Sequence, residues 1–296
     1  MDMLFISITL AAFGMVFGSF AGAQVWRLRA QQLRIDKKTG EKVSEAEYKR
    51  LTPLLRSVKS DRSECLNCHH ELHWYDMIPV ISWLTLGGRC RYCHHNIGWL
   101  EPSIEIGMSA LFVLSYVYWP FMLNAPLEWI RLAVWLVACV LMAILFVYDA
   151  KWSLLPFAIN IGLVITGAVF LALSIIITPF TPADWWSLLG SIGILSGLYY
   201  LFSIPGWVGL GDAILGLGLA MILTRWDQAF LVLFLANLLG CLALIPLVLK
   251  RTLTRGAQIP FGPFLMLATV VALLWGPTII SAVFDWSGIL INPLMI

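Results

Sequence analysis

Residues 129–148 read WIRLAVWLVACVLMAILFVY and contain a single charged side chain, Arg131. An apolar segment of about 20 residues is long enough to cross the hydrocarbon core of a bilayer as a helix. The acidic residue Asp149 follows at once, where such a helix would reach the membrane surface. The segment therefore predicts a membrane-spanning helix with a carboxylate at one end.

The whole chain has the composition of a membrane protein. Of its 296 residues, 60% are hydrophobic and 12% are charged, which leaves too little polar surface to cover the core of a soluble protein of this size. We therefore predict an all-α polytopic membrane protein with about eight transmembrane helices. The expected spans are residues 4–26, 104–123, 129–148, 154–177, 186–204, 208–223, 227–249 and 264–285.

The basic residues gather in one segment between the first two expected spans. Residues 27–103 contain 13 of the 19 Lys and Arg, all five His and four of the six Cys. Because cytoplasmic loops of membrane proteins are enriched in Lys and Arg, we place this insert in the cytoplasm. We expect three parts: a first transmembrane helix at 1–26, the cytoplasmic insert at 27–103 and a multi-helix transmembrane core at 104–296.

Two further patterns bear on the structure of the first span and the insert. Gly14, Gly18 and Gly22 recur every four residues, so they line one helix face and favour close contact with a neighbouring helix. Residues 34–62 are strongly charged, and we expect a solvated helix or a flexible linker there.

The insert contains two Cys-x-x-Cys pairs. Cys65 and Cys68 are separated from Cys90 and Cys93 by 21 residues. Each pair can hold a metal ion from a tight turn, and two pairs complete a tetrahedral tetrathiolate zinc site. Four protein ligands leave no coordination position for water, so the predicted zinc is structural. The insert is thus expected to be a small zinc-binding cytoplasmic domain.

A second interpretation of the same pairs is attachment of c-type haem, because His69 and His94 directly follow them. The chain would then be a membrane-anchored dihaem cytochrome. Such haems are attached on the outer side of the membrane, whereas the basic residues place the insert on the inner side. The zinc interpretation is therefore preferred.

Two acidic residues stand out in the apolar core. Asp149 ends the third expected span, and Asp212 begins the sixth, in the GLGD stretch Gly209–Asp212. The predicted topology puts both at the cytoplasmic edge of the membrane, where they can meet. Two close carboxylates resist simultaneous ionisation, so the pair retains one proton. The ionised member can then activate water while the protonated one polarises a carbonyl, which predicts that Asp149 and Asp212 are catalytic.

Two other classes of function remain open on this evidence from the residues. The same pair of carboxylates would also suit the proton relay of a proton-coupled transporter, although the chain lacks the internal repeat that transporters often show. A non-enzymatic membrane scaffold that displays a zinc module is the other alternative, and it leaves the GLGD stretch unexplained.

Several short stretches complete the pattern. In chain order they are GSF at Gly18–Phe20, the Cys pairs around WYDMIPVISWL at Trp74–Leu84, EPSIEI at Glu101–Ile106, Asp149 followed by Leu155 and Pro156, GLGD at Gly209–Asp212, and IPFGPFL at Ile259–Leu265. These stretches run over most of the chain and appear in the same order as in the type IV prepilin peptidases, which are membrane aspartyl proteases of the GxGD type. In this respect the sequence resembles that family.

The resemblance implies a helical membrane core and a specific reaction. The enzyme would remove the short basic leader of prepilin-like or pseudopilin-like precursors at the cytoplasmic face of the bacterial inner membrane. Many members then methylate the new N-terminus with S-adenosylmethionine. By motif match, Asp149 and Asp212 are the catalytic pair. The metal ligands carried over in the same way are Cys65, Cys68, Cys90 and Cys93.

The implied partners are the precursor proteins and the lipid bilayer, with no nucleic acid and no particular oligomeric state predicted. Ile214 and Phe157 stand where family members commonly have Lys and an acidic residue, which bears on leader specificity. No residue is assigned to S-adenosylmethionine. Acidic residues that would suit a basic leader or methyl transfer are Glu71, Asp76, Glu101 and Glu105.

Overall fold

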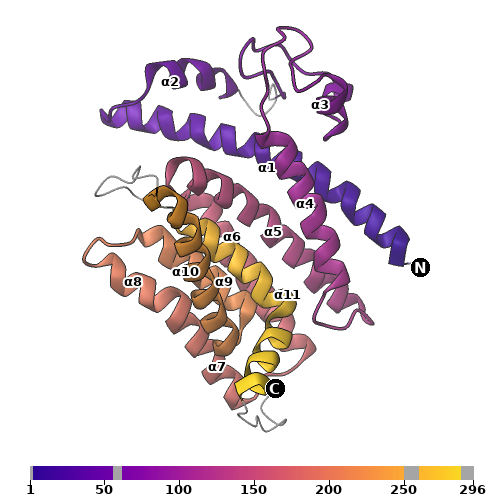
Figure 1. Cartoon of the computed structure of the whole chain (residues 1–296), viewed down its shortest axis with the longest axis vertical. Coiled ribbons are helices and arrows are strands. Elements are labelled where there is room, and N and C mark those ends of the chain that lie inside the picture. The colour runs from indigo at the N-terminus through magenta and orange to yellow at the C-terminus, as the bar shows by residue number, and fades with distance from the viewer. Residues whose placement is uncertain (1–2, 56–61, 250–259, 288–296) are drawn as a thin grey trace. The chain divides into compact units, whose positions relative to one another are not determined.

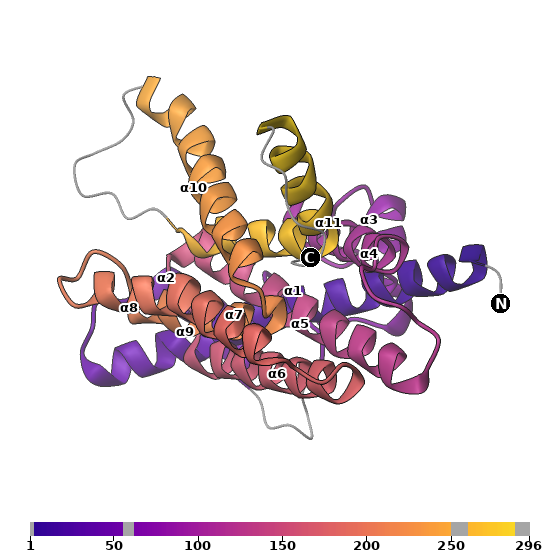
Figure 2. The same ribbon diagram turned by 90° about the horizontal axis from the view of Figure 1, so that it is seen from below.

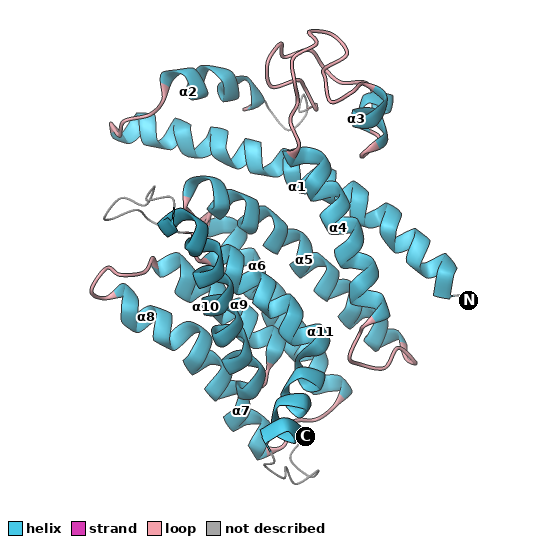
Figure 3. Cartoon of the chain, viewed as in Figure 1, coloured by secondary structure: helices cyan, strands magenta, loops and turns pink. Residues whose placement is uncertain are grey.

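The computed structural model describes residues 3–55, 62–249 and 260–287. Within these ranges the regular elements are all helices, and the extended pairs are two isolated antiparallel bridges (Figure 3). The prediction of an all-α chain is therefore confirmed. The chain forms two compact units, Met1–Val117 and Tyr118–Ile296 (Figure 1). The functional division at residues 26 and 103 stays a prediction.

The first unit consists of two long helices and of the insert, which lies between them in the sequence. Its elements are α1 (Met3–Thr39), α2 (Glu45–Leu51), η1 (Thr52–Leu54), η3 (Trp74–Met77), α3 (Ile81–Thr85) and α4 (Leu100–Val117). The first expected span covers only the N-terminal part of α1, which continues as a helix far into the charged segment. The second expected span begins and ends later than α4 does.

The charged part of α1 is stabilised by α2, which folds back along it. Ala30 and Leu33 of α1 and Leu51 of α2 form a small buried cluster. Arg29 also makes a two-pronged ion pair with Glu47, with nitrogen–oxygen distances of 3.1 and 3.0 Å. The described part of residues 34–62 is therefore mostly helical, in two α-helices that are joined by residues 40–44.

Two glycines let α1 and α4 touch through their backbones, and the helices lie side by side in both views (Figures 1 and 2). A Cβ atom at Gly14 would lie 2.7 Å from the carbonyl oxygen of Met108, and one at Gly18 would lie 2.7 Å from the Cα of Glu105. At Gly22 the nearest atom would be the Ile104 Cδ1 at 3.7 Å, an ordinary contact. The predicted glycine face is therefore a packing face, and its first two positions have no room for a side chain.

The second unit contains the remaining apolar helices. They are α5 (Pro126–Trp152), α6 (Phe157–Ile177), α7 (Pro182–Ile192), η4 (Gly193–Gly197), α8 (Leu198–Ser203), α9 (Leu210–Leu223), α10 (Trp226–Leu249) and α11 (Gly262–Ser287). The elements α7, η4 and α8 run on as one apolar span, and its middle part, η4, has π-helical hydrogen bonding.

The short helix α9 lies among its neighbours in the interior of this unit. At 1.5 Å per residue its 14 residues extend about 21 Å, less than the roughly 30 Å of a hydrocarbon core. Gly216 permits its burial, because a Cβ there would collide with the Leu195 backbone. Ser196 of η4 donates a hydrogen bond of 2.9 Å to the carbonyl of Ala213. Packing therefore fixes the position of α9 and of Asp212 in its first turn.

Seven described helices are long and apolar enough to cross a membrane, and α9 is a shorter apolar helix beside them. This agrees with the prediction of about eight spans, of which the sixth was expected to be short. The chain is a multi-pass membrane protein.

The contact between α1 and α4 leads to a first prediction. Gly18→Val should separate the two helices, because its side chain has to occupy the volume of the Glu105 backbone, and we expect a large loss of folded protein in detergent. Gly22→Ala is the matched control and should be tolerated. Size-exclusion chromatography measures the folded yield of the two variants, and thermal unfolding measures their melting temperatures. Equal melting temperatures for the two variants would contradict the packing described here.

Candidate active site and metal cluster

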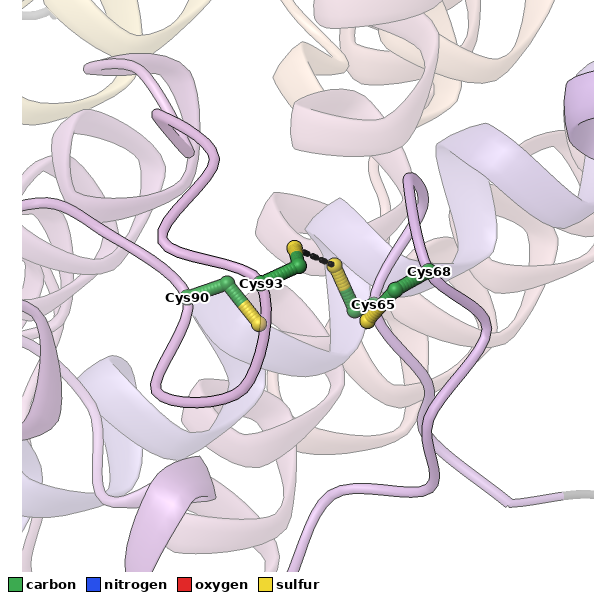
Figure 4. A group of neighbouring side chains, drawn as sticks. All are labelled: Cys65, Cys68, Cys90 and Cys93. Atoms are coloured by element: carbon green, nitrogen blue, oxygen red, sulfur yellow. Dashed lines mark hydrogen bonds between the residues drawn. The ribbon is translucent and has the colours of Figure 1, made fainter.

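The four cysteines of the insert converge on one point. Their sulfur atoms all lie within 4.8 Å of one another (Figure 4), and the Sγ atoms of Cys65 and Cys93 are 3.9 Å apart. Each pair contributes its sulfurs from a separate turn, so the cluster joins the two ends of the 21-residue stretch between them. Four convergent thiols form a site that could hold a metal ion.

The two Cys turns have the same backbone conformation. In the first, the N–H of Cys65 donates to the carbonyl of His70 at 3.0 Å, and the N–H of His69 donates to the carbonyl of Cys65 at 2.9 Å. His69 has a left-handed backbone, with φ of +56°. The same bonds and a φ of +55° recur in the second turn, at Cys90, His94 and His95.

This geometry favours one ion over two haems. In c-type attachment each Cys pair would bond its own porphyrin and the following His would bind the iron. Here the two pairs share a single point, and Nδ1 of His69 lies 3.0 Å from a carboxylate oxygen of Glu64. The haem interpretation does not fit this arrangement.

The thiols differ in how easily they lose a proton. Burial raises the pKa of the Cys65 and Cys90 thiols, whereas the backbone N–H of His95 lowers the pKa of Cys93 to about 6. Thiolates, not thiols, bind metal ions. Cys93 is therefore ready to bind at neutral pH, and binding of a dication has to displace protons from the other thiols.

Asp149 lies in the last turn of α5 and is almost fully buried, with 5% of its surface exposed. The backbone of Gly262, the first residue of α11, faces its carboxylate. A Cβ at Gly262 would lie 2.6 Å from Oδ2 of Asp149. A glycine at position 262 therefore leaves room for the Asp149 carboxylate beside α11, and a larger residue would not.

Asp212 lies in the first turn of α9, where its N–H donates to the carbonyl of Gly209 at 3.1 Å. Its side chain is partly exposed. Asp149 and Asp212 are near enough for their charges to interact. The structure thus brings these two predicted residues together, while their catalytic roles stay a prediction.

The GLGD turn is held from α6. Asn160 is buried, and its amide nitrogen donates a hydrogen bond of 2.7 Å to the carbonyl of Gly211. Its amide oxygen is buried and has no hydrogen-bond partner among the described residues. Leu155, which follows Asp149 in the chain, packs on the same glycine, since a Cβ at Gly211 would lie 3.2 Å from its Cβ.

A tyrosine completes the surroundings of the pair. Tyr199 of α8 is buried and interacts electrostatically with Asp212. Its ring centre is 5.7 Å from that of Phe261, the residue before Gly262. The candidate active site is therefore built from α5, α6, α8, α9 and the start of α11, all within the second unit.

Two of these neighbours were not predicted from the sequence. Asn160 did carry a signal, because a lone amide in an apolar span is costly unless it has a partner. Tyr199 carried none, because an aromatic residue in such a span is ordinary. The contact of Asn160 with Gly211 joins residues that are 51 positions apart in the chain.

Three of the acidic residues that were considered for binding a basic leader have side-chain partners within the first unit, namely Asp76, Glu101 and Glu105. Asp76 accepts hydrogen bonds from Arg91 at 2.7 Å and Tyr92 at 3.1 Å. Burial by itself would raise the pKa of Asp76, but these bonds outweigh it and lower the pKa. Asp76 thus fastens the WYD segment to the second Cys turn.

Glu101 and Glu105, on α4, also have partners. Glu101 accepts a hydrogen bond of 3.1 Å from the indole of Trp26, and Glu105 accepts one of 2.7 Å from the backbone N–H of Val80. Both carboxylates therefore hold parts of the first unit together.

Comparison with known proteins gives consistent matches. The family model for the bacterial peptidase A24 N-terminal domain matches residues 12–119. The prepilin leader peptidase/N-methyltransferase of Aeromonas hydrophila is 31% identical over 90% of both chains, and that of Pseudomonas aeruginosa is 28% identical over 93% of this chain and 92% of its own. The type 4 prepilin-like proteins leader peptide-processing enzyme of Escherichia coli is 28% identical over 88% and 90%. No solved structure matches the chain.

The convergence of four thiols predicts about one tightly bound metal ion per chain. Cys90→Ser removes one ligand, and we expect the purified variant to lose most of its metal and part of its folded yield. Cys241→Ser, which changes an exposed thiol outside the cluster, should keep the metal. Elemental mass spectrometry measures the content. A Soret band, or metal content unchanged in Cys90→Ser, would contradict the assignment.

Proposed function

The chain belongs to the family of prepilin leader peptidase/N-methyltransferases, and we propose that it is an aspartic endopeptidase that uses Asp149 and Asp212 to remove leader peptides. The observation that carries the proposal is that α5 and α9 bring these two carboxylates together beside the glycine turn. The transporter alternative has no support in the structure or among the relatives.

In the proposed reaction the two carboxylates divide the work. Asp212, at the N-terminus of α9, is stabilised as the anion by the helix dipole and takes a proton from the attacking water. Asp149, which is more deeply buried, is the protonated member and donates to the oxygen of the scissile carbonyl. When the tetrahedral intermediate collapses, the C–N bond breaks, the carboxyl group now formed at Asp212 gives its proton to the leaving amine, and one hydroxyl of the intermediate returns a proton to Asp149.

The substrates in this proposal are prepilin-like or pseudopilin-like precursors with short basic leaders. The concentration of Lys and Arg in residues 27–103 orients the chain with the insert and the active site at the cytoplasmic face of the bacterial inner membrane. A basic leader then remains in the cytoplasm while the apolar helix behind it stays in the bilayer. The scissile bond between them reaches the level of the carboxylates.

The second activity is methylation of the new N-terminus. S-adenosylmethionine would supply the methyl group, and the amine released by cleavage would accept it. The described residues contain no strand, and therefore no strand–loop–helix motif of the kind that holds nucleotide cofactors. We assign no residue to this cofactor.

The metal in the Cys cluster is zinc in this proposal. Four thiolates in two tight turns are the ligand set of structural zinc sites, and they leave no position open for catalysis by the ion. Zinc would hold the two turns together and so maintain the fold of the insert.

The catalytic pair can be tested by replacing one carboxylate at a time. Asp149→Asn and Asp212→Asn should each lower the rate of leader removal by about 10²–10⁴-fold, because neither variant retains both an acid and a base. Asp285→Asn, at an exposed position of α11, is the matched control. Co-expression with a precursor and gel analysis of its size measures cleavage. Full processing by either variant at the pair would refute the assignment.

Gly262 offers a test of geometry that leaves both carboxylates in place. Gly262→Ala has to displace the Asp149 side chain, and we expect cleavage to slow by up to about 10²-fold. Gly162→Ala on α6 is the control, since its Cβ would lie 3.8 Å from Leu141. Both should insert and bind metal normally. Unchanged cleavage in Gly262→Ala would show that the contact with α11 does not position Asp149.

A further inference from the structure

The insert exposes several large apolar side chains around α3. Such residues are expensive to leave in water when they form a group. The group lies in the segment between the two Cys pairs and just after it. Its members are Trp74, Met77, Ile81, Leu84 and Trp99, which are exposed by 74%, 42%, 58%, 63% and 71%.

The beginning of α3 is tied to the interior of a membrane-spanning helix. The N–H of Val80 donates a hydrogen bond of 2.7 Å to Oε2 of Glu105. Glu105 is the sixth residue of α4, about 7 Å along the helix axis from Leu100. Figure 2 shows α3 next to α4. Val80 therefore lies at the level of the apolar span, and not in the water beyond it.

The turn at Val80 is held in an unusual conformation. Its φ is +59° and its ψ is −47°, and the N–H of Ile81 donates back to the carbonyl of Pro79. A γ-turn of this hand is rare, and a positive φ is strained for a β-branched residue. The bond to the Glu105 carboxylate stabilises it, and the turn directs the chain into α3.

The other side of α3 is tied to the residues that precede α4. The indole of Trp83 donates a hydrogen bond of 2.8 Å to the carbonyl of Gly98, and its ring centre lies 4.3 Å from that of Trp99. Trp99 is the residue directly before the first residue of α4. The start of α3 and its middle residue, Trp83, are thus tied to the N-terminal part of α4 and to the residues just before it.

We propose that α3 is an interfacial membrane anchor, with Ile81 and Leu84 inserted among phospholipid acyl chains beside α4. The hydrogen bond from Val80 holds α3 beside α4, and tryptophans such as Trp99 are favoured at the boundary between acyl chains and headgroups. The insert then rests on the bilayer surface. The inference depends on the membrane location of α4 and is independent of the peptidase chemistry.

Photocrosslinking in membranes tests this contact. The photoreactive residue p-benzoylphenylalanine is introduced into the full-length chain at Ile81 or at Leu84, and membranes containing phosphatidylethanolamine and phosphatidylglycerol are irradiated. Mass spectrometry should find phospholipid adducts at both positions. The control is the same residue at Ala46, an exposed position of α2 between Glu45 and Glu47, which should give no lipid adduct.

A second variant tests the link between α3 and α4, and its metal content reports whether the insert is still folded. Glu105→Ala removes the acceptor for Val80, so the lipid adduct at Ile81 should be lost or strongly reduced while the Cys cluster keeps its metal. Adducts at Ile81 and Leu84 with protein instead of lipid would overturn the proposal, and so would equal lipid labelling at Ala46. Lipid labelling at Ile81 unchanged by Glu105→Ala would equally overturn the anchoring through α4.

Discussion

A polar group inside an apolar helix has to find its partner within the protein, because the bilayer core offers no water to solvate it. This constraint accounts for the contacts that matter most in this chain. Asp149 lies against the backbone of Gly262 and within electrostatic reach of Asp212. The amide of Asn160 is bonded to the GLGD turn. In the first unit, Glu105 meets a backbone N–H of the insert. Each carboxylate or amide marks a place where separate segments are joined.

Close packing of the helices makes these contacts possible. Glycines at helix contacts remove the side chains that would otherwise keep the backbones apart, as Gly14 and Gly18 do between α1 and α4 and Gly216 does for α9. Gly262 has the same effect at the proposed active site, where it leaves space for the carboxylate of Asp149. The chain combines rigid apolar packing with a few polar groups at helix ends, and this is the arrangement that a proteolytic dyad needs to hold its geometry.

Much of the helical fold could be predicted from the sequence, because membrane spans follow from the length and hydropathy of single segments. Their ends were less predictable: α1 runs on to Thr39 because α2 packs against its charged part. Asp149 and Asp212 were recognisable because a topology assigns both to one edge. The contact of Gly262 with Asp149 was not, since it depends on how helices distant in sequence pack together. Tyr199 was not recognisable either, because an aromatic residue in an apolar span is ordinary. The Cys pairs were predictable from spacing, whereas the proposal of an interfacial position for α3 required the bond from Val80 to α4.

The most direct test of the account is whether residues 149 and 212 lie face to face in the membrane. Asp149→Cys and Asp212→Cys are combined in a chain that also carries Cys139→Ala and Cys241→Ala, and the membranes are treated with a short bifunctional thiol reagent. Mass spectrometry should find the two positions linked within one chain, and the same treatment of an Asp149→Cys, Asp285→Cys chain should give no link. If both thiols at 149 and 212 react singly and never become linked, the central claim is wrong.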